Sequence, residues 1–363
     1  MLIRNVVTGA GVLSFLALLT SASAIDYGLN PATVELTSAG PLTFTPDGVL
    51  IIGDPKAATI YAIEPEESSS SGAARFDIPD FRTKVAQAVG TPRPLIADVA
   101  IHPETGSLYA SVQTAKGAAI ARVTADGLVS AVDLDKVLSS KVHLPNPPED
   151  REVGRGGRTR NLRLESITDL AIHDGRLLVS GLSAKDSPST VLEFEFPLNE
   201  NSRSFYTEIY HAAHGRVEDN AAIRSFIPIN IGGEPSLLAG FTCTPLVRFP
   251  MHTSGTEAKV RGKTVAELGN RNRPLDMVLY TKDDQEYLLI TNSARGVMRL
   301  KTDNIDQQEG LSQRVQGGGT AGLPFEQVDG WDGVIQLAKL DQQHAVVVIE
   351  DGNQWQLKTL PLP

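Results

Sequence analysis

Acidic side chains at the start of repeated apolar segments are the residues of this sequence best suited to do chemistry. Four aspartates, each next to a short apolar run, are of this kind: Asp98, Asp169, Asp276 and Asp332. Carboxylates that converge in a low-dielectric site repel one another, and protonation or a bound cation relieves the repulsion. Ca²⁺ prefers about six to eight oxygen ligands, which can include side-chain amides such as those of Asn270, Asn272 and Asn292. The alternative is that each aspartate accepts hydrogen bonds from nearby backbone amides in a turn.

A cation held in this way would act as a Lewis acid, and a neighbouring group would then have to activate water. We assign the catalytic roles to Asp276 and His173. Arg273 and Arg295 flank the hairpin that contains Asp276, and together with Asn292 they can bind an anionic ligand. The structural alternatives are that the arginines neutralise Asp276 in an ion-pair network and that His173 stabilises a turn.

The aspartates belong to a repeated unit made of an apolar strand, a tight polar turn and a second apolar strand, usually followed by a third strand. Six copies begin at residues 41, 98, 169, 228, 276 and 332, with separations of 57, 71, 59, 48 and 56 residues. One such sheet cannot bury both of its faces alone, whereas radial packing against neighbouring copies can. The sequence therefore predicts an all-β fold, a β-propeller with six blades of three to four antiparallel strands. A seventh blade is possible if residues 112–166 contain a degenerate copy, and residues 26–38 are expected to close the ring by adding a strand to the last blade.

The copy Asp98-Val-Ala-Ile-His-Pro-Glu-Thr-Gly106-Ser-Leu108-Tyr resembles the blade repeat of gluconolactonase- and paraoxonase-type six-bladed propellers. It is also similar to repeats of the NHL and YVTN groups. The lactonase resemblance implies an axial Ca²⁺ that is bound at the strand heads, here Asp98, Asp169, Asp276 and Asp332, and that polarises a lactone or ester carbonyl. The Asn-Gly and Asp-Gly pairs usual at these strand heads in that family do not occur at Asp98, Asp169 or Asp276.

Composition limits the class of protein. The chain has 363 residues, 41% of them hydrophobic, and a formal net charge of -10, which argues against a nucleic-acid partner. Cys243 is the single cysteine, so no intramolecular disulfide can form, and no motif for an organic cofactor occurs. We expect a calcium-dependent hydrolase of a lactone or ester, or alternatively a non-catalytic propeller that binds a periplasmic protein or a small anionic ligand.

Residues 1–24 have the pattern of a secretory signal peptide, with Arg4, an apolar run and the small residues Ala22-Ser-Ala24. The mature protein, residues 25–363, is expected to be one propeller domain without a membrane span, periplasmic or secreted. An Arg- and Pro-rich insertion at about residues 139–164 is either a solvated loop or an anion-binding lid over the channel. His211-Ala-Ala-His214 has a spacing that a transition metal can use, but we expect two surface histidines.

Overall fold

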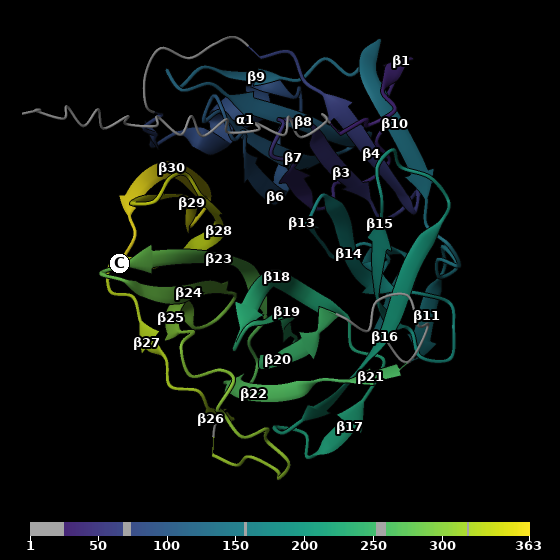
Figure 1. The fold of residues 1–363 in the computed structure, drawn as a ribbon. Coiled ribbons are helices and arrows are strands. Elements are labelled where there is room, and N and C mark those ends of the chain that lie inside the picture. Colours follow the sequence, from purple (N-terminus) through teal and green to yellow (C-terminus); the bar gives the residue numbers. More distant parts are fainter. Residues whose placement is uncertain (1–24, 68–73, 156–157, 252–258, 318) are drawn as a thin grey trace, which may run out of the picture.

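The structure is a computed structural model that describes residues 25–67, 74–155, 158–251, 259–317 and 319–363. Six β-sheets are arranged radially around a common axis, as the ribbon in Figure 1 shows. The predicted six-bladed β-propeller is therefore confirmed, with blades of four or more strands. The helical elements with defined bounds in the described residues are α1 (Phe81–Ala88) and the 3-10 turn η1 (Leu162–Glu165). No helix in these ranges is long and apolar enough to span a membrane.

Tight turns with left-handed backbone produce the repeated hairpins that the sequence predicts. Asp174 and Gly175 have φ values of 48° and 71° between the first two strands of one blade. Asp283 and Asp284, with φ values of 50° and 60°, make the corresponding turn in another blade. Two consecutive residues with positive φ give a turn whose twist matches that of the flanking strands, and Asp and Gly tolerate this conformation best.

We number the blades I to VI by the chain order of their inner strands. Blade I consists of β2 (Leu42–Phe44), β3 (Leu50–Asp54), β4 (Thr59–Glu64), β10 (Val137–His143) and, at its edge, β1 (Asn30–Ala32). Blade II consists of β6 (Leu95–Ile101), β7 (Leu108–Thr114), β8 (Gly117–Val123) and β9 (Val129–Ala131). A separate hairpin, β11 (Glu152–Arg155) with β12 (Arg158–Asn161), lies within the predicted insertion.

Blades III and IV carry extra strands at their outer edges. Blade III consists of β13 (Asp169–His173), β14 (Arg176–Leu182), β15 (Ser189–Phe194), β16 (Ser202–His211), β17 (Arg216–Glu218) and the parallel strand β21 (Lys259–Arg261). Blade IV consists of β18 (Ile223–Ile231), β19 (Glu234–Phe241), β20 (Pro245–Pro250), β22 (Lys263–Leu268) and β26 (Thr320–Gly322).

Blades V and VI have four strands each. Blade V consists of β23 (Pro274–Lys282), β24 (Gln285–Asn292), β25 (Gly296–Lys301) and β27 (Glu326–Gln327). Blade VI consists of β28 (Val334–Lys339), β29 (His344–Asp351), β30 (Gln354–Pro361) and β5 (Asp77–Ile78), which comes from far earlier in the chain.

The blades do not follow one another around the ring in chain order. The inner strand of blade I, β2, contacts those of blades II and III, and β28 of blade VI contacts those of blades II and V. The circular order is therefore I, II, VI, V, IV, III, with blade II between blade VI and blade I. Six apolar clusters, one between each pair of neighbouring blades, follow the same order.

Ring closure differs from the expectation for residues 26–38. Strand β1 pairs with β10 in blade I and not with the last blade, so that prediction was wrong. The outer strand of blade VI is β5 instead, which pairs with β30. The described part of residues 112–166 contains no seventh blade, because it completes blade II and supplies β10 to blade I before the β11–β12 hairpin.

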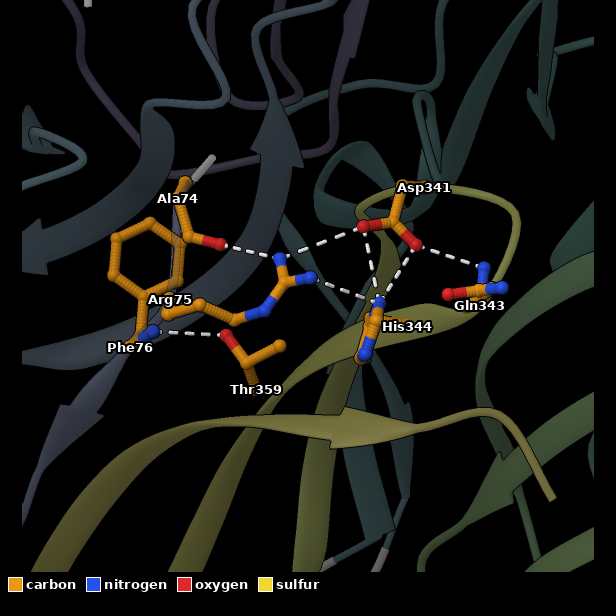
Figure 2. Close-up of polar contacts among 7 residues, drawn as sticks. All are labelled: Ala74, Arg75, Phe76, Asp341, Gln343, His344 and Thr359. Atoms are coloured by element: carbon orange, nitrogen blue, oxygen red, sulfur yellow. Dashed lines mark hydrogen bonds and ion pairs between the residues drawn. The ribbon is translucent and has the colours of Figure 1, made fainter. Parts of the chain in front are cut away.

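Polar contacts fasten the segment before β5 to blade VI, as Figure 2 shows. Arg75 donates from Nη1 to the carbonyl of Ala74 at 2.7 Å and reaches Asp341 Oδ2 at 3.4 Å. Its Nη2 lies 3.2 Å from Nδ1 of His344. The Phe76 amide donates to the hydroxyl of Thr359 at 2.8 Å. This junction holds the chain at the edge of blade VI, before it continues through α1 into blade II.

Candidate functional site

Three of the four predicted aspartates line the central channel, which has a volume of about 550 Å³. Asp98, Asp169 and Asp276 belong to the inner strands of blades II, III and V, and they line the channel together. In the circular order these blades alternate with blades I, IV and VI. The three carboxyl groups are therefore arranged around the channel with approximate three-fold symmetry.

Each of these aspartates bridges its own blade to a neighbouring blade. In all three, Oδ1 accepts the amide of the next residue, at 2.7–2.8 Å. The second oxygen accepts an amide from the adjacent inner strand: Leu42 for Asp98 at 2.7 Å, Phe226 for Asp169 at 2.7 Å and Leu337 for Asp276 at 3.1 Å. The aspartates accept backbone amides, as the alternative expectation had it, but the bonds lie within a strand and between blades and do not form a turn. Only a carboxyl group has two oxygens to accept both amides, whereas asparagine has one.

The enclosed carboxyl groups hold their protons more tightly than usual. Burial, together with the charge of Asp169, raises the pKa of Asp98 to about 8. Burial raises the pKa of Asp169 to about 7, although backbone amides act in the opposite direction. Burial and then the charges of Asp98 and Asp169 raise the pKa of Asp276. Burial thus favours the protonated form of each of these carboxyl groups, because low-dielectric surroundings stabilise a charge less well than water does.

The fourth aspartate and the asparagines do not complete a calcium site in the channel. Asp332 is exposed and precedes β28. Within β28, Asp276 binds the amide of Leu337, and the residue before Leu337 is Gln336 and not an aspartate. Asn272 and Asn292 are buried and bonded to each other, Nδ2 to Oδ1, at 3.0 Å. Asn270 is exposed on the preceding turn. The amide oxygens are thus engaged or lie outside the residues that line the channel.

The spacing of the three carboxyl groups does not fit one directly bound ion. The oxygens that share a Ca²⁺ lie within about 5 Å of one another, because each is about 2.3–2.6 Å from the ion. Asp98, Asp169 and Asp276 are not among the described residues whose ligand atoms all lie within 4.8 Å of one another. Their oxygen chemistry suits a hard cation, but their separation suits a larger cationic group.

The two residues assigned to catalysis lie at opposite ends of the channel. His173 ends the strand that Asp169 begins, so about 13 Å of extended chain separates the two. Asp276 is in the ring with Asp169, whereas Nε2 of His173 lies 3.4 Å from Oδ2 of Asp174. The structure therefore brings together the three aspartates and leaves His173 apart from them.

The two predicted anion-binding arginines contact different partners. Arg295 donates from Nη2 to the carbonyl of Asn270 at 3.2 Å and packs on Gly269, where a Cβ would lie 2.4 Å from the guanidinium. The pKa of Arg273 is lowered by burial and then by the charge of Arg224, a residue that sequence reasoning missed. Arg224 in turn pairs with Glu165 at 3.2 Å. Arg224 and Glu165 are far apart in the sequence, so no local pattern reveals their ion pair.

The Arg- and Pro-rich insertion is anchored and not draped over the channel. Arg163 donates from Nη1 to the carbonyl of Lys56 at 3.3 Å and from Nε to the carbonyl of Pro148. In the view of Figure 1, β11 lies toward the rim of the ring. Sequence reasoning also missed the mixed character of the channel wall, in which the half-buried apolar residues Ile101, Ala171 and Leu279 lie beside the polar ones.

No protein family and no curated protein sequence matched the chain. Structural similarity to solved propellers extends over most of the chain at low TM-score. A PQQ-bound aldose sugar dehydrogenase from Streptomyces coelicolor is 12% identical, with a TM-score of 0.36 over 93% of this chain and 98% of that chain. A putative glucose dehydrogenase from Thermus thermophilus is 14% identical, with a TM-score of 0.32 over 92% and 99%. The Dos1 propeller is 12% identical, with a TM-score of 0.32 over 88% and 69%. These likenesses carry no functional argument, and the strand pairing establishes the chain as a six-bladed β-propeller.

Proposed function

We propose that this protein is a binding propeller whose central channel takes a small molecule with a cationic group and an apolar body. The observation that carries the proposal is the ring of three enclosed carboxyl groups, Asp98, Asp169 and Asp276, at one place in the channel. A bound cation would reverse the repulsion among these groups and stabilise their ionised forms. Perturbed acids that converge in a cavity are a general mark of functional sites.

The channel wall supports a ligand that is partly apolar. The lining includes the half-buried apolar residues Ile101, Ala171 and Leu279, and further burial of these side chains against an alkyl chain would be favourable. A cavity of about 550 Å³ falls within the usual range for small-molecule sites. An ammonium group offers three N–H donors, which can reach the carboxyl groups directly or through bridging waters.

Calcium-dependent hydrolysis of a lactone or ester is the second candidate, and convergence of the same three carboxyl groups favours it. It would require Asp98, Asp169 and Asp276 to move closer together around one ion. It would also require a base other than His173, because His173 lies at the other end of the channel. Export of the chain remains part of the proposal. It is inferred from residues 1–24, which lie outside the described residues.

Thermal melting and calorimetry of tag-free residues 25–363 test the proposal. The probes are hexylamine, its uncharged counterpart hexanol, and CaCl₂ with and without chelator, each at pH 6 and pH 8.5. We expect hexylamine to bind and to raise the melting temperature more than hexanol, with the larger effect at pH 8.5. Asp98→Asn should remove the advantage of the amine over the alcohol.

Asp332→Asn is the matched control, because it makes the same side-chain change at an exposed aspartate outside the channel. Equal effects of amine and alcohol, or equal losses in the two asparagine variants, would overturn the proposal. Calcium binding with one equivalent, reversed by chelator and lost in Asp98→Asn, would favour the hydrolase instead. Circular dichroism confirms that each variant is folded before it is compared.

A further inference from the structure

A second cluster of ligating side chains lies far from the channel, at the outer edge of blade III. His211 and His214 flank the turn between β16 and β17 and both contact Glu218. The expectation of two surface histidines was wrong for His211, whose side chain is only 2% exposed. The cluster is formed by residues that the channel does not use.

The backbone brings the three side chains to one side of the hairpin. His211 pairs with Arg216 in the antiparallel register, and Glu218 lies two residues further on the same face. The Gly215 amide donates to the His211 carbonyl at 2.8 Å, which closes a single helical turn. His214, three residues after His211, therefore comes back over the same side, and the two imidazole rings lie 3.7 Å apart.

The nitrogen and oxygen atoms are spaced as metal ligands are. Nδ1 of His211 lies 2.9 Å from Oε2 of Glu218, and Nδ1 of His214 lies 2.8 Å from Oε1. One ligand atom from each of the three residues lies within 4.8 Å of the others. Two ligands that are each about 2.0–2.2 Å from a metal ion are themselves roughly 3 Å apart, so binding needs little movement.

Blade IV and a neighbouring loop hold this turn in place. The Ala213 amide, between the two histidines, donates to Oε1 of the fully buried Glu267 at 3.0 Å. The Val315 amide donates to the Ala212 carbonyl at 2.9 Å. The hydroxyl of Thr264 donates to the Tyr210 carbonyl at 2.7 Å. Preorganisation of this kind reduces the entropy that ligands lose when they order around an ion.

Two buried polar atoms have no hydrogen-bond partner among the described residues: Nε2 of His211 in the cluster and Oε2 of Glu267 beside it. Ligation of a metal through Nδ1 leaves the ring proton on Nε2. Histidine ligands usually donate this second N–H to a carboxylate, a carbonyl or water. Glu267 supplies an unpartnered carboxyl oxygen at the same turn, so the surroundings of the cluster also fit a metal site.

We propose that His211, His214 and Glu218 bind a borderline divalent transition metal, with Zn²⁺ as the preferred ion. Two imidazoles and one carboxylate suit Zn²⁺ and not the hard Ca²⁺, which prefers oxygen ligands alone. Three protein ligands leave a fourth coordination position, and His214, with 42% of its side chain exposed, places that position toward solvent. Arg216, whose Nε lies 2.8 Å from Oε1 of Glu218, orients the carboxylate.

Calorimetry of tag-free, chelator-stripped residues 25–363 with ZnCl₂ tests this site. We expect one equivalent of Zn²⁺ to bind, and Co²⁺ to give visible absorption bands of low-symmetry coordination. His214→Gln should weaken Zn²⁺ binding by about 100-fold or more, because it removes a metal ligand. Loss of a residue that only contacts a ligand already costs about 10- to 100-fold in metal affinity. Since His214 is partly exposed, this variant is expected to fold, and Glu218→Gln provides a second test.

His344→Gln is the matched control. His344 also contacts a carboxylate, Asp341, at 2.9 Å with an arginine beside it, but no second histidine is in that group (Figure 2). The His344→Gln variant should bind zinc with the affinity of the unaltered protein. The channel variant Asp98→Asn should do the same. Absence of stoichiometric zinc binding, equal affinity in His214→Gln, or an equal loss in His344→Gln would overturn the proposal.

Discussion

The carboxyl oxygen Oδ2 of Asp169 in blade III accepts the backbone amide of Phe226 in blade IV at 2.7 Å. The equivalent bonds of Asp98 and Asp276 join two further pairs of neighbouring blades, so all six blades are linked in three pairs. The groups that line the proposed binding site therefore also hold the ring together. Binding and stability are coupled in this protein because one set of carboxyl groups serves both.

Replacement of Asp169 by alanine should destabilise the fold. The change leaves the amides of Leu170 and Phe226 without their acceptor, and each unsatisfied buried amide costs about 1–3 kcal/mol. Relief of carboxyl repulsion offsets part of this cost, so we expect the free energy of unfolding to fall by about 2 kcal/mol. Urea denaturation measures the change, and Asp332→Ala should stay within about 0.5 kcal/mol of the unaltered protein. A similar loss in both variants would contradict the bridging role.

The stability of the ligand-free protein should depend on pH through Asp98. Its pKa is raised to about 8 in the folded protein, above the value near 4 of an unfolded aspartate. The folded state then binds more protons between these values, so this contribution is fully present below about pH 4 and is lost as pH rises to about 8. Denaturation at a series of pH values should show a smaller decrease between pH 5 and pH 8 in Asp98→Asn. An unchanged pH profile in that variant would mean that Asp98 is ionised throughout.

Asn272 should prove to be structural. Its Nδ2 donates to Asn292 at 3.0 Å, and its Oδ1 accepts the Ala294 amide at 3.2 Å, which stabilises the turn that follows β24. Asn272→Ala should lower the free energy of unfolding by about 1–3 kcal/mol, because two buried hydrogen bonds are lost. Its affinity for hexylamine and for Ca²⁺ should not change. Calorimetry of the folded variant measures both affinities. Loss of either affinity would indicate that Asn272 is a ligand after all.

The junction between blades II and VI should depend on Phe81. Its side chain is fully buried in helix α1, within the apolar cluster that also contains Trp355 of blade VI. Phe81→Ala should cost about 3–5 kcal/mol, as large-to-small changes in a core usually do. Arg82, whose guanidinium lies 4.6 Å from the Trp355 ring, is the surface control, and Arg82→Ala should cost about 1 kcal/mol or less. Thermal and urea unfolding measure both variants. If Phe81→Ala and Arg82→Ala lowered the stability equally, the junction would not be a packed core.

Local pattern was enough to predict the propeller and its channel acids. The hairpins depend on residues close in sequence, such as Asp174 and Gly175 at a turn, and their repetition indicates radial packing. Asp98, Asp169 and Asp276 belong to the inner strands of three copies of the repeat, so their place around one axis follows from that repetition. Asp332 breaks the pattern, because the strand of blade VI begins two residues later and Gln336 occupies the position next to the bonded amide.

The amino-acid sequence by itself determined the strands, the turns and the number of blades, since these arise from contacts between residues a few positions apart. Only the tertiary structure decided the circular order of the blades, with blade II between blades VI and I, because β5 and β10 pair with strands distant in the chain. It also decided which polar groups meet. His211 and Glu218 contact each other through strand register and one turn, and the distances among the channel carboxyl groups depend on how six separate sheets pack.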